Sequence, residues 1–186
     1  FKTVLELYGI DKNKVTGAII SSVVPQLVNN IKSAVYKLIK ITPMVVGPGI
    51  KTGLNILMDE PRRVGSDLIV DAVAAINVYG TPAIVIDMGT ATTMSVIDRK
   101  NNYIGGVIMP GIRVAVDSLV SRTAQLQRIS LDAPDKVIGK NTINCMKSGV
   151  VYGNAACIDG MIDRMAAELG EPLEDIKVVA TGGLAK

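Results

Sequence analysis

The sequence contains no histidine and no tryptophan, and it has one phenylalanine and two cysteines among its 186 residues. Without histidine, the commonest general base and most zinc or iron sites are excluded. The two cysteines, Cys145 and Cys157, lack the spacing of metal ligands, so we expect both to be small buried thiols. Any catalysis must therefore rely on carboxylates, hydroxyls, backbone amides and cations bound by oxygen.

The net charge is small, and long apolar runs are missing from the sequence. The sequence has 20 basic and 17 acidic residues, and the resulting net charge of +3 is spread along the chain. The sequence lacks the dense basic stripe and the stacking aromatics of nucleic-acid binders, so we expect no nucleic acid partner. No apolar run approaches the about 20 residues that span a bilayer, and no signal peptide is visible. We therefore expect a cytoplasmic protein without a membrane partner.

Aliphatic residues supply the core, because 48% of the residues are hydrophobic but only 3% are aromatic. Periodicity predicts helices around Val4–Leu7 and over Pro25–Leu38, Val64–Val78, Gly111–Leu126 and Thr142–Leu169, the last with Gly149 or Gly153 as positions where it could break. Strands are predicted over Lys14–Val24, Thr42–Val46, Ala83–Ile86, Thr92–Ile97, Tyr103–Ile108 and Lys177–Ala180. The glycines and proline at 47–49 are predicted to interrupt the secondary structure. This alternation predicts an α/β fold whose mixed sheet is covered by helices on both faces, with residues 1–80 and 81–186 as two units.

The chemically richest stretch is the turn between the third and fourth predicted strands. One buried strand ends at Asp87, and Gly89 with Thr90 then forms a tight turn. The hydroxyls of Thr90, Thr92 and Thr93 and the turn amides could bind phosphate, and Asp87 could hold a cation. From these residues alone, an ordinary turn in which Asp and Gly only satisfy geometry is an equally good interpretation. An aspartic protease is disfavoured, because it needs two such loops in a longer all-β chain.

Seven segments, in order, resemble the type III pantothenate kinases, which belong to the superfamily of acetate and sugar kinases, heat-shock chaperone ATPases and actin. The segments are GPGIKTGLNI (47–56), PRRVGSD (61–67), DMGTATT (87–93), GGVIMPGI (105–112), GKNT (139–142), SGVVYG (148–153) and ATGGLA (180–185). The resemblance implies tandem ribonuclease H-like domains, a homodimer, and phosphorylation of pantothenate by ATP to 4'-phosphopantothenate, the first step of coenzyme A biosynthesis. It also implies Mg²⁺ with the ATP and a monovalent cation, either K⁺ or NH₄⁺.

The same resemblance implies roles for individual residues. Pantothenate would be bound by Gly65, Ser66, Asp67, Leu68 and Thr142. Asp67 would also be the catalytic proton acceptor, Asp87 the ligand of the monovalent cation, and Thr90 a contact to the ATP phosphates. An aspartate of ordinary pKa, about 3.9, suffices, because in phosphoryl transfer the attacking hydroxyl loses its proton late. A helix cap is the structural alternative for both Asp67 and Thr142.

The sequence departs from the family pattern near the expected substrate site. The family has Arg where this chain has Leu68, Tyr where it has Met58, and Asn where it has Asp71. If that Arg binds the substrate carboxylate, its loss removes a contact worth about 1.5–3 kcal/mol, or about ten- to a hundredfold in affinity. Arg63, one helical turn upstream, is our hypothesis for a replacement.

Two other functions stay open on the sequence. One is a catalytically impaired family member that acts as a regulatory or binding protein, like the relatives named Bvg accessory factors. The other is a chaperone-type ATPase or a kinase for another hydroxy acid. The family's first phosphate loop, an Asp-x-Gly-Asn segment, and its C-terminal helices have no counterpart in the sequence. We therefore expect both ends of the parent protein to lie outside this chain.

Overall fold

Two structural units make up the computed structural model, which describes residues 1–47 and 50–185. Unit 1 comprises Phe1–Leu54 and Asp59–Val73, and unit 2 comprises Asn55–Met58 and Ala74–Lys186. The predicted interruption of secondary structure at 47–49 includes Pro48 and Gly49, which lie outside the described residues.

Unit 1 contains short helices and a small pair of parallel strands. Its elements are α1 (Lys2–Leu7), η1 (Lys12–Lys14), β1 (Ile19–Ile20), α2 (Pro25–Ile39), β2 (Met44–Val45), η2 (Pro61–Arg63) and the first half of α3 (Ser66–Tyr79). The predicted helix that starts at Pro25 is confirmed. The two predicted strands are much shorter than expected, because β1 and β2 pair with each other over only two residues. A strand extends only as far as a partner completes its hydrogen bonds.

Unit 2 is organised around a five-stranded mixed sheet with the strand order β3-β6-β5-β4-β7. Its elements are β3 (Asn55–Ile56), β4 (Ala83–Met88), β5 (Ala91–Ile97), β6 (Asn102–Pro110), α4 (Ile112–Arg122), α5 (Thr142–Leu169), η3 (Leu173–Asp175) and β7 (Lys177–Thr181). Strands β4, β5 and β6 form an antiparallel meander. The outer strands are parallel to their neighbours, β7 to β4 and β3 to β6.

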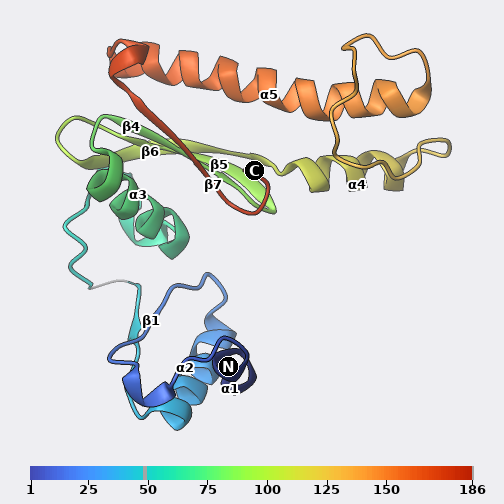
Figure 1. The fold of residues 1–186 in the computed structure, drawn as a ribbon. Coiled ribbons are helices and arrows are strands. Elements are labelled where there is room, and N and C mark those ends of the chain that lie inside the picture. The colour runs from blue at the N-terminus through green and yellow to red at the C-terminus, as the bar shows by residue number, and fades with distance from the viewer. Residues whose placement is uncertain (48–49, 186) are drawn as a thin grey trace. The chain divides into compact units, whose positions relative to one another are not determined.

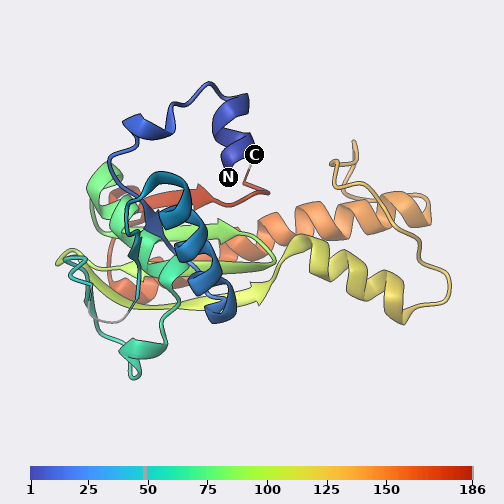
Figure 2. The same ribbon diagram turned by 90° about the horizontal axis from the view of Figure 1, so that it is seen from below.

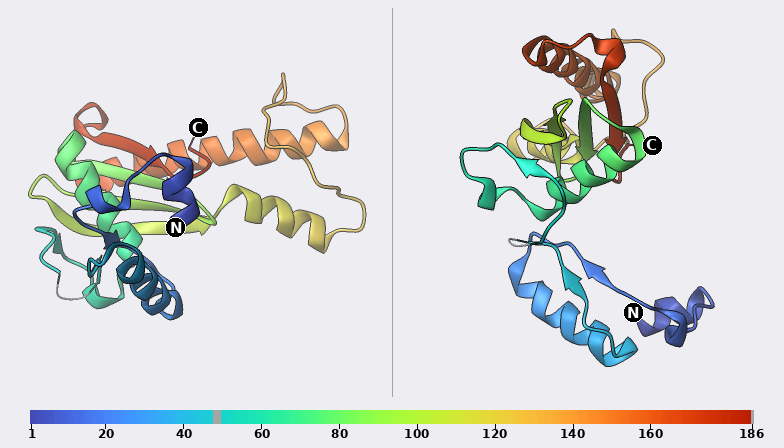
Figure 3. Two further views of the ribbon diagram at one scale, coloured as in Figure 1. Left: turned by 60° about the horizontal axis from the view of Figure 1, so that its bottom comes forward. Right: turned by 90° about the vertical axis from the view of Figure 1, so that its left-hand side faces the viewer.

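Helices cover both faces of this sheet. Helix α5 lies along one face, and the C-terminal half of α3, residues 74–79, lies on the other (Figures 1 and 3). Between α5 and the sheet, Ile84, Ile86 and Met94 pack against Met165 of the helix. The predicted mixed sheet flanked by helices is therefore confirmed, whereas the tandem ribonuclease H-like domains stay a prediction.

A carboxylate fixes the turn between β5 and β6. The side chain of Asp98 accepts hydrogen bonds from the backbone N–H of Lys100 (2.8 Å) and from the backbone (2.9 Å) and side-chain (2.7 Å) nitrogens of Asn102. Burial alone would raise the pKa of Asp98, but the hydrogen bonds from Asn102 and Lys100 outweigh it, so this pKa lies below its ordinary value. The turn sets the register of the meander that carries the candidate site.

Helix α4 and the N-terminal half of α5 extend beyond the end of the sheet (Figures 1 and 2). We call these two segments and the intervening loop, residues 123–141, the helical arm. Helix α5 runs unbroken through Gly149 and Gly153, because Met146 and Val150 bury its inner face at this level. At 28 residues α5 is long, yet in the described part of the chain no helix is both long and apolar enough to cross a membrane.

The loop of the helical arm is fastened to α5 by side-chain contacts. Lys147 pairs with Asp132 at 2.6 Å, and the Tyr152 hydroxyl donates to the carbonyl oxygen of Pro134 at 2.7 Å. The Ser148 hydroxyl donates to the carbonyl oxygen of Val137. The loop is thus held against the start of α5.

Replacement of Asp132 by Asn tests the charged part of this fastening. The hydrogen bond from Lys147 holds the pKa of Asp132 at about 2, below its ordinary value of 3.8. A depressed folded-state pKa contributes stability above the unfolded-state value that is lost as the pH falls towards the folded-state value. We expect Asp132→Asn to lower the urea midpoint at neutral pH, and the difference from wild type to vanish between about pH 4 and pH 2. A difference that is independent of pH would contradict this assignment.

Both cysteines are exposed, which corrects the expectation of buried thiols. Cys145 lies in the first turn of α5, where its thiol donates to the carbonyl oxygen of Gly139 at 3.4 Å. Cys157 lies further along α5, with its sulfur 3.6 Å from the sulfur of Met109. Packing against the sheet and the arm decides which face of α5 is buried, and neither thiol lies on it.

Candidate functional site

A row of three polar residues crosses the sheet where β4 ends. Asp87 of β4 lies directly opposite Thr93 of β5 and pairs with Thr181 of β7. Side chains of directly paired residues point to the same face of a sheet. These three, which we call the Asp87 row, therefore share the face opposite to the core residues Ile86 and Met94.

The chain passes close to the Asp87 carboxylate just after β7. A Cβ atom placed on Gly182 would lie 2.5 Å from Oδ1 of Asp87 and 2.6 and 2.7 Å from the backbone N and O of Met88. Gly182 also has a φ of +94°, a conformation that other residues rarely adopt. The backbone N–H of Leu184 donates to the carbonyl oxygen of Met88 at 3.3 Å. Glycine is thus required where this segment crosses the end of β4.

The turn after Asp87 is held between β5 and the start of α4. The N–H of Gly89 donates to the carbonyl oxygen of Ala91, and the N–H of Gly111 donates to that of Thr90, both at 3.0 Å. A Cβ on Gly111 would lie 2.4 Å from the carbonyl oxygens of both Gly89 and Thr90. Thr90 itself is exposed at the tip of the turn. A fixed turn that presents a hydroxyl to solvent beside a carboxylate suits the binding of an anionic phosphate with its cation.

The donor set around Asp87 fits a monovalent cation. Residues 1–47 and 50–185 contain no group of three or more His, Cys, Asp or Glu side chains that could hold a metal ion. One carboxylate with neutral oxygens nearby balances a single positive charge, and the hydroxyl oxygen of Thr93 is buried without a hydrogen-bond partner. Mg²⁺ is usually bound through one or two carboxylates and the substrate phosphates. The Asp87 row therefore suits K⁺ or NH₄⁺ better than a divalent ion bound by protein groups alone.

The expected pantothenate motif begins α3, in unit 1. The helix starts at Ser66, so Asp67 lies in its first turn and is not the cap. Oδ1 of Asp67 accepts a hydrogen bond from the N–H of Leu68 at 2.9 Å, and a Cβ on Gly65 would lie within 2.4 Å of that oxygen. The Ser21 hydroxyl donates to that of Ser66 at 3.1 Å. Gly65 therefore leaves room for an exposed carboxylate at a helix N-terminus, where the helix dipole favours negative charge.

The hypothetical replacement charge, Arg63, has a partner. Its guanidinium forms an ion pair with Glu60 at 2.6 Å, and both side chains are largely exposed. Leu68 is half-buried. The guanidinium of Arg63 is thus engaged by a carboxylate of its own segment.

Thr142 is the first residue of α5, and the cap of that helix is Asn141, whose side chain accepts from the N–H of Asn144 at 2.9 Å. The N-terminal end of α5 lies beyond the sheet, away from the β4–β5 turn (Figures 1 and 2). The structure thus brings Asp87 and Thr90 together and places Thr142 apart from them in the same unit. The motif around Asp67 belongs to unit 1.

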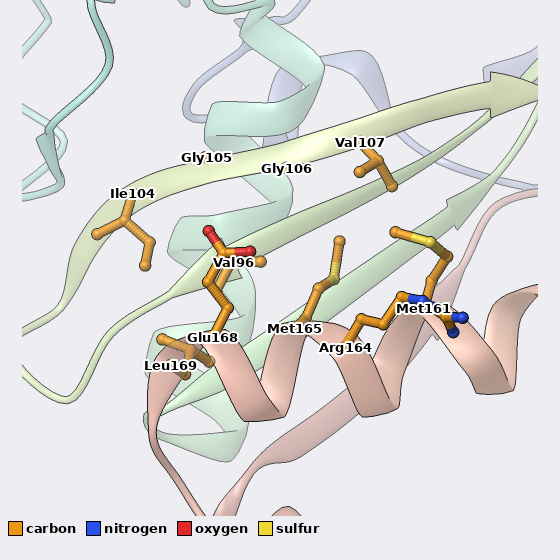
Figure 4. Close-up of a pocket in the computed structure, with 10 residues that line it drawn as sticks. All are labelled: Val96, Ile104, Gly105, Gly106, Val107, Met161, Arg164, Met165, Glu168 and Leu169. Carbon is orange, nitrogen blue, oxygen red and sulfur yellow. The ribbon is translucent and has the colours of Figure 1, made fainter.

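A cavity of about 360 Å³, which no sequence motif predicted, lies between α5 and strands β5 and β6. Figure 4 shows its lining, which is mostly apolar and includes two charged side chains of α5. The lining residues are Val96, Ile104, Gly105, Gly106, Val107, Met161, Arg164, Met165, Glu168 and Leu169. None of the residues expected to bind substrate, nucleotide or cation is among them.

Comparison with known proteins identifies the family. The sequence model of the type III pantothenate kinases matches residues 1–164 of the 186. The chain belongs to the type III pantothenate kinase family. Membership of this family makes it a kinase, that is, a phosphotransferase, for which ATP with Mg²⁺ is the expected donor.

A solved structure has the same fold as this pantothenate kinase family member. It is that of a conserved Campylobacter jejuni protein assigned to the Baf family of transcriptional activators. The TM-score is 0.55 and the sequence identity 22%, and the match covers 91% of this chain and 69% of the other. At this identity the likeness concerns the fold alone.

Proposed function

We propose that this protein phosphorylates pantothenate with ATP to give 4'-phosphopantothenate, the first step of coenzyme A biosynthesis. The observation that carries the proposal is the family match over residues 1–164, which includes both the start of α3 and the β4–β5 turn. The protein would act in the cytoplasm as a homodimer. It would require Mg²⁺ and a monovalent cation, K⁺ or NH₄⁺.

Asp67 is the proton acceptor in this proposal. Its carboxylate is exposed at the start of α3, and one of its oxygens is held by the N–H of Leu68. The other oxygen can accept a hydrogen bond from the attacking hydroxyl, orient it, and take its proton late in the transfer. Gly65 and Ser66, which precede Asp67, would contact the same substrate.

Asp87 and Thr90 bind the ATP phosphates and their cation in this proposal. Thr90 is exposed at the turn and would contact the phosphates of ATP, while Asp87 would hold the monovalent cation. A bound cation would offset the negative charge of the phosphates. The contacts of Gly89 and Gly111 keep the turn in one shape, so little has to be ordered when the nucleotide binds.

A homodimer would give Thr142 a role in substrate binding. This residue lies on the helical arm, away from the β4–β5 turn of its own subunit, and in a dimer it would contact the substrate bound to the second copy. The loop just before it exposes two apolar side chains, Val137 (65% exposed) and Ile138 (83% exposed). Burial of such side chains in a subunit interface would be favourable.

A coupled assay of ADP release tests the proposed function. The protein is given ATP, Mg²⁺ and saturating K⁺, with and without pantothenate. We expect ADP release that depends on pantothenate. Release that is the same without pantothenate, or no release at all, would contradict the proposal.

The same assay decides the alternative, a catalytically impaired member with a regulatory or binding role. Leu68 favours this alternative, because a half-buried leucine cannot bind a carboxylate. The solved structure of the Baf family protein adds only a shared fold. No turnover with pantothenate at saturating K⁺ would favour the alternative.

Leu68→Arg should improve substrate binding. An arginine here would restore a charge-assisted contact to the carboxylate of pantothenate, so we expect KM for pantothenate to fall by about ten- to a hundredfold. Arg63→Ala is the matched experiment. If Arg63 supplies the charge in the wild type, its loss raises KM; an unchanged KM would exclude it, in agreement with its ion pair to Glu60.

A further inference from the structure

The hydroxyl of Thr93 is buried without a hydrogen-bond partner, and within the described part of the chain no other buried side-chain oxygen or nitrogen is in this state. A buried hydroxyl left unpaired costs about 1–3 kcal/mol. Such a group in a native structure calls for an explanation, such as strain, a catalytic role, or a bound water molecule or ion. Thr93 therefore needs an explanation that its own fold does not provide.

The neighbour of Thr93 points to the missing contact. Asp87 lies directly opposite it in the β4–β5 pairing, so the two side chains share a face, with Cβ atoms about 4.5–5.5 Å apart in such pairs. Among the described residues Asp87 has no ion pair or hydrogen bond to its carboxylate, although the side chain is half-buried. Two oxygen groups in one row of the sheet thus lack partners.

We propose that Thr93 is a second oxygen ligand of the monovalent cation at Asp87, an inference that rests on the proposed function. A hydroxyl oxygen is a hard, neutral donor, so it adds to the coordination of a cation without changing the charge balance set by one carboxylate. Its proton stays available for an acceptor such as a phosphate oxygen.

The strands on either side make the row rigid. Thr93 is paired with Asp87 on one side and with Ile108 on the other, both within the antiparallel meander. On the far side of Asp87, the backbone of Gly182 passes so close that an added Cβ would overlap Oδ1 of the carboxylate. A ligand set on central strands needs no reordering when the cation binds.

Thermal unfolding at increasing KCl tests the proposal, with tetramethylammonium chloride added to keep the ionic strength constant. Wild type should be stabilised by K⁺, because a cation that binds only the folded state shifts the unfolding equilibrium. Thr93→Val keeps the shape of the side chain and removes the hydroxyl. We expect its half-maximal KCl concentration to rise about tenfold or more. Without K⁺ it should be at least as stable as wild type, because the unpaired hydroxyl is gone.

Two further variants test whether the hydroxyl and the carboxylate are responsible for the K⁺ response. Thr93→Ser retains the hydroxyl and should respond to K⁺ like wild type, whereas Asp87→Asn should lose the response. If Thr93→Val does not fold, Thr93→Ala carries the same test. A wild-type half-maximal concentration in the variant without the hydroxyl would overturn the proposal, and so would an unchanged K⁺ response combined with weakened ATP binding.

The kinase proposal and the assignment of Thr93 as a cation ligand can fail independently, and the experiments distinguish the two cases. If wild type shows no response to K⁺, both the cation site and the role of Thr93 are wrong. If K⁺ stabilises wild type through Asp87 and Thr93 but the assay finds no pantothenate-dependent ADP release, the kinase proposal fails and the ligand assignment stands.

Discussion

Asparagine in place of Asp67 is expected to lower kcat for pantothenate phosphorylation by about 10²- to 10⁴-fold, the usual contribution of a general base. Asparagine has the same shape, and its oxygen can still accept the hydrogen bond that the N–H of Leu68 gives to Asp67 at 2.9 Å. The start of α3 should therefore survive, and KM for pantothenate should change little. The measurement is steady-state kinetics, with circular dichroism to confirm the fold.

Asp59→Asn is the matched control for this experiment. Asp59 is also an exposed aspartate of unit 1, but it lies outside the motif at the start of α3. Its replacement should leave kcat within about twofold of wild type, because surface changes away from a site usually have small effects. If Asp67→Asn retained as much activity as Asp59→Asn, the assignment of Asp67 as the proton acceptor would be wrong.

Gly182→Ala should damage both the fold and the cation site. Its Cβ would lie 2.5 Å from Oδ1 of Asp87 and 2.6 Å from the backbone N of Met88, and its φ of +94° is unfavourable for alanine. Residues held in such a conformation cost about 1–3 kcal/mol. We expect a loss of stability of that order in urea unfolding. Stabilisation by K⁺ should also be lost, because the carboxylate of Asp87 would be displaced.

Gly183→Ala provides the matched control, since a Cβ at the neighbouring Gly183 meets nothing within 4 Å. This variant should keep the stability and the K⁺ response of wild type to within about 0.5 kcal/mol, as expected for a surface change. Equal behaviour of the two variants would contradict the view that the chain after β7 closes around Asp87.

Local patterns predicted much of this fold. Pro25 and the apolar periodicity after it identified α2, and the predicted limits of the long helix, Thr142–Leu169, agree with α5. The alternation before Asp87 and the turn after it identified the β4–β5 hairpin. These features depend on neighbours in sequence, so the sequence alone contains their signals.

The other features could not be predicted, because they depend on contacts between residues that are far apart in the sequence. The strand β3 was not predicted, because Asn55 and Ile56 become a strand only through pairing with β6, more than forty residues later. The exposure of Cys145 depends on which side of α5 faces the arm and the sheet. The unpaired hydroxyl of Thr93 likewise could not be predicted, because it follows from the register of three strands and the packing around them.

The same distinction between local and distant residues applies to the candidate site. The residues expected to act on the nucleotide, Asp87 and Thr90, lie three positions apart, at the end of β4 and in the turn that follows it, which is why sequence spacing sufficed to group them. Thr142 is remote in sequence, and its place at the start of α5, beyond the sheet, follows from how far that helix runs past the strands.

Transfer of a phosphoryl group from ATP to pantothenate can be followed directly with ATP that carries ³²P in its γ-phosphate. Purified protein is incubated with labelled ATP, pantothenate, Mg²⁺ and K⁺, and the products are separated by chromatography. We expect wild type to move the label into 4'-phosphopantothenate in step with ADP, and the Asp67→Asn protein to do so at least about a hundredfold more slowly. Label that appears only as inorganic phosphate, or that stays in ATP, would contradict it.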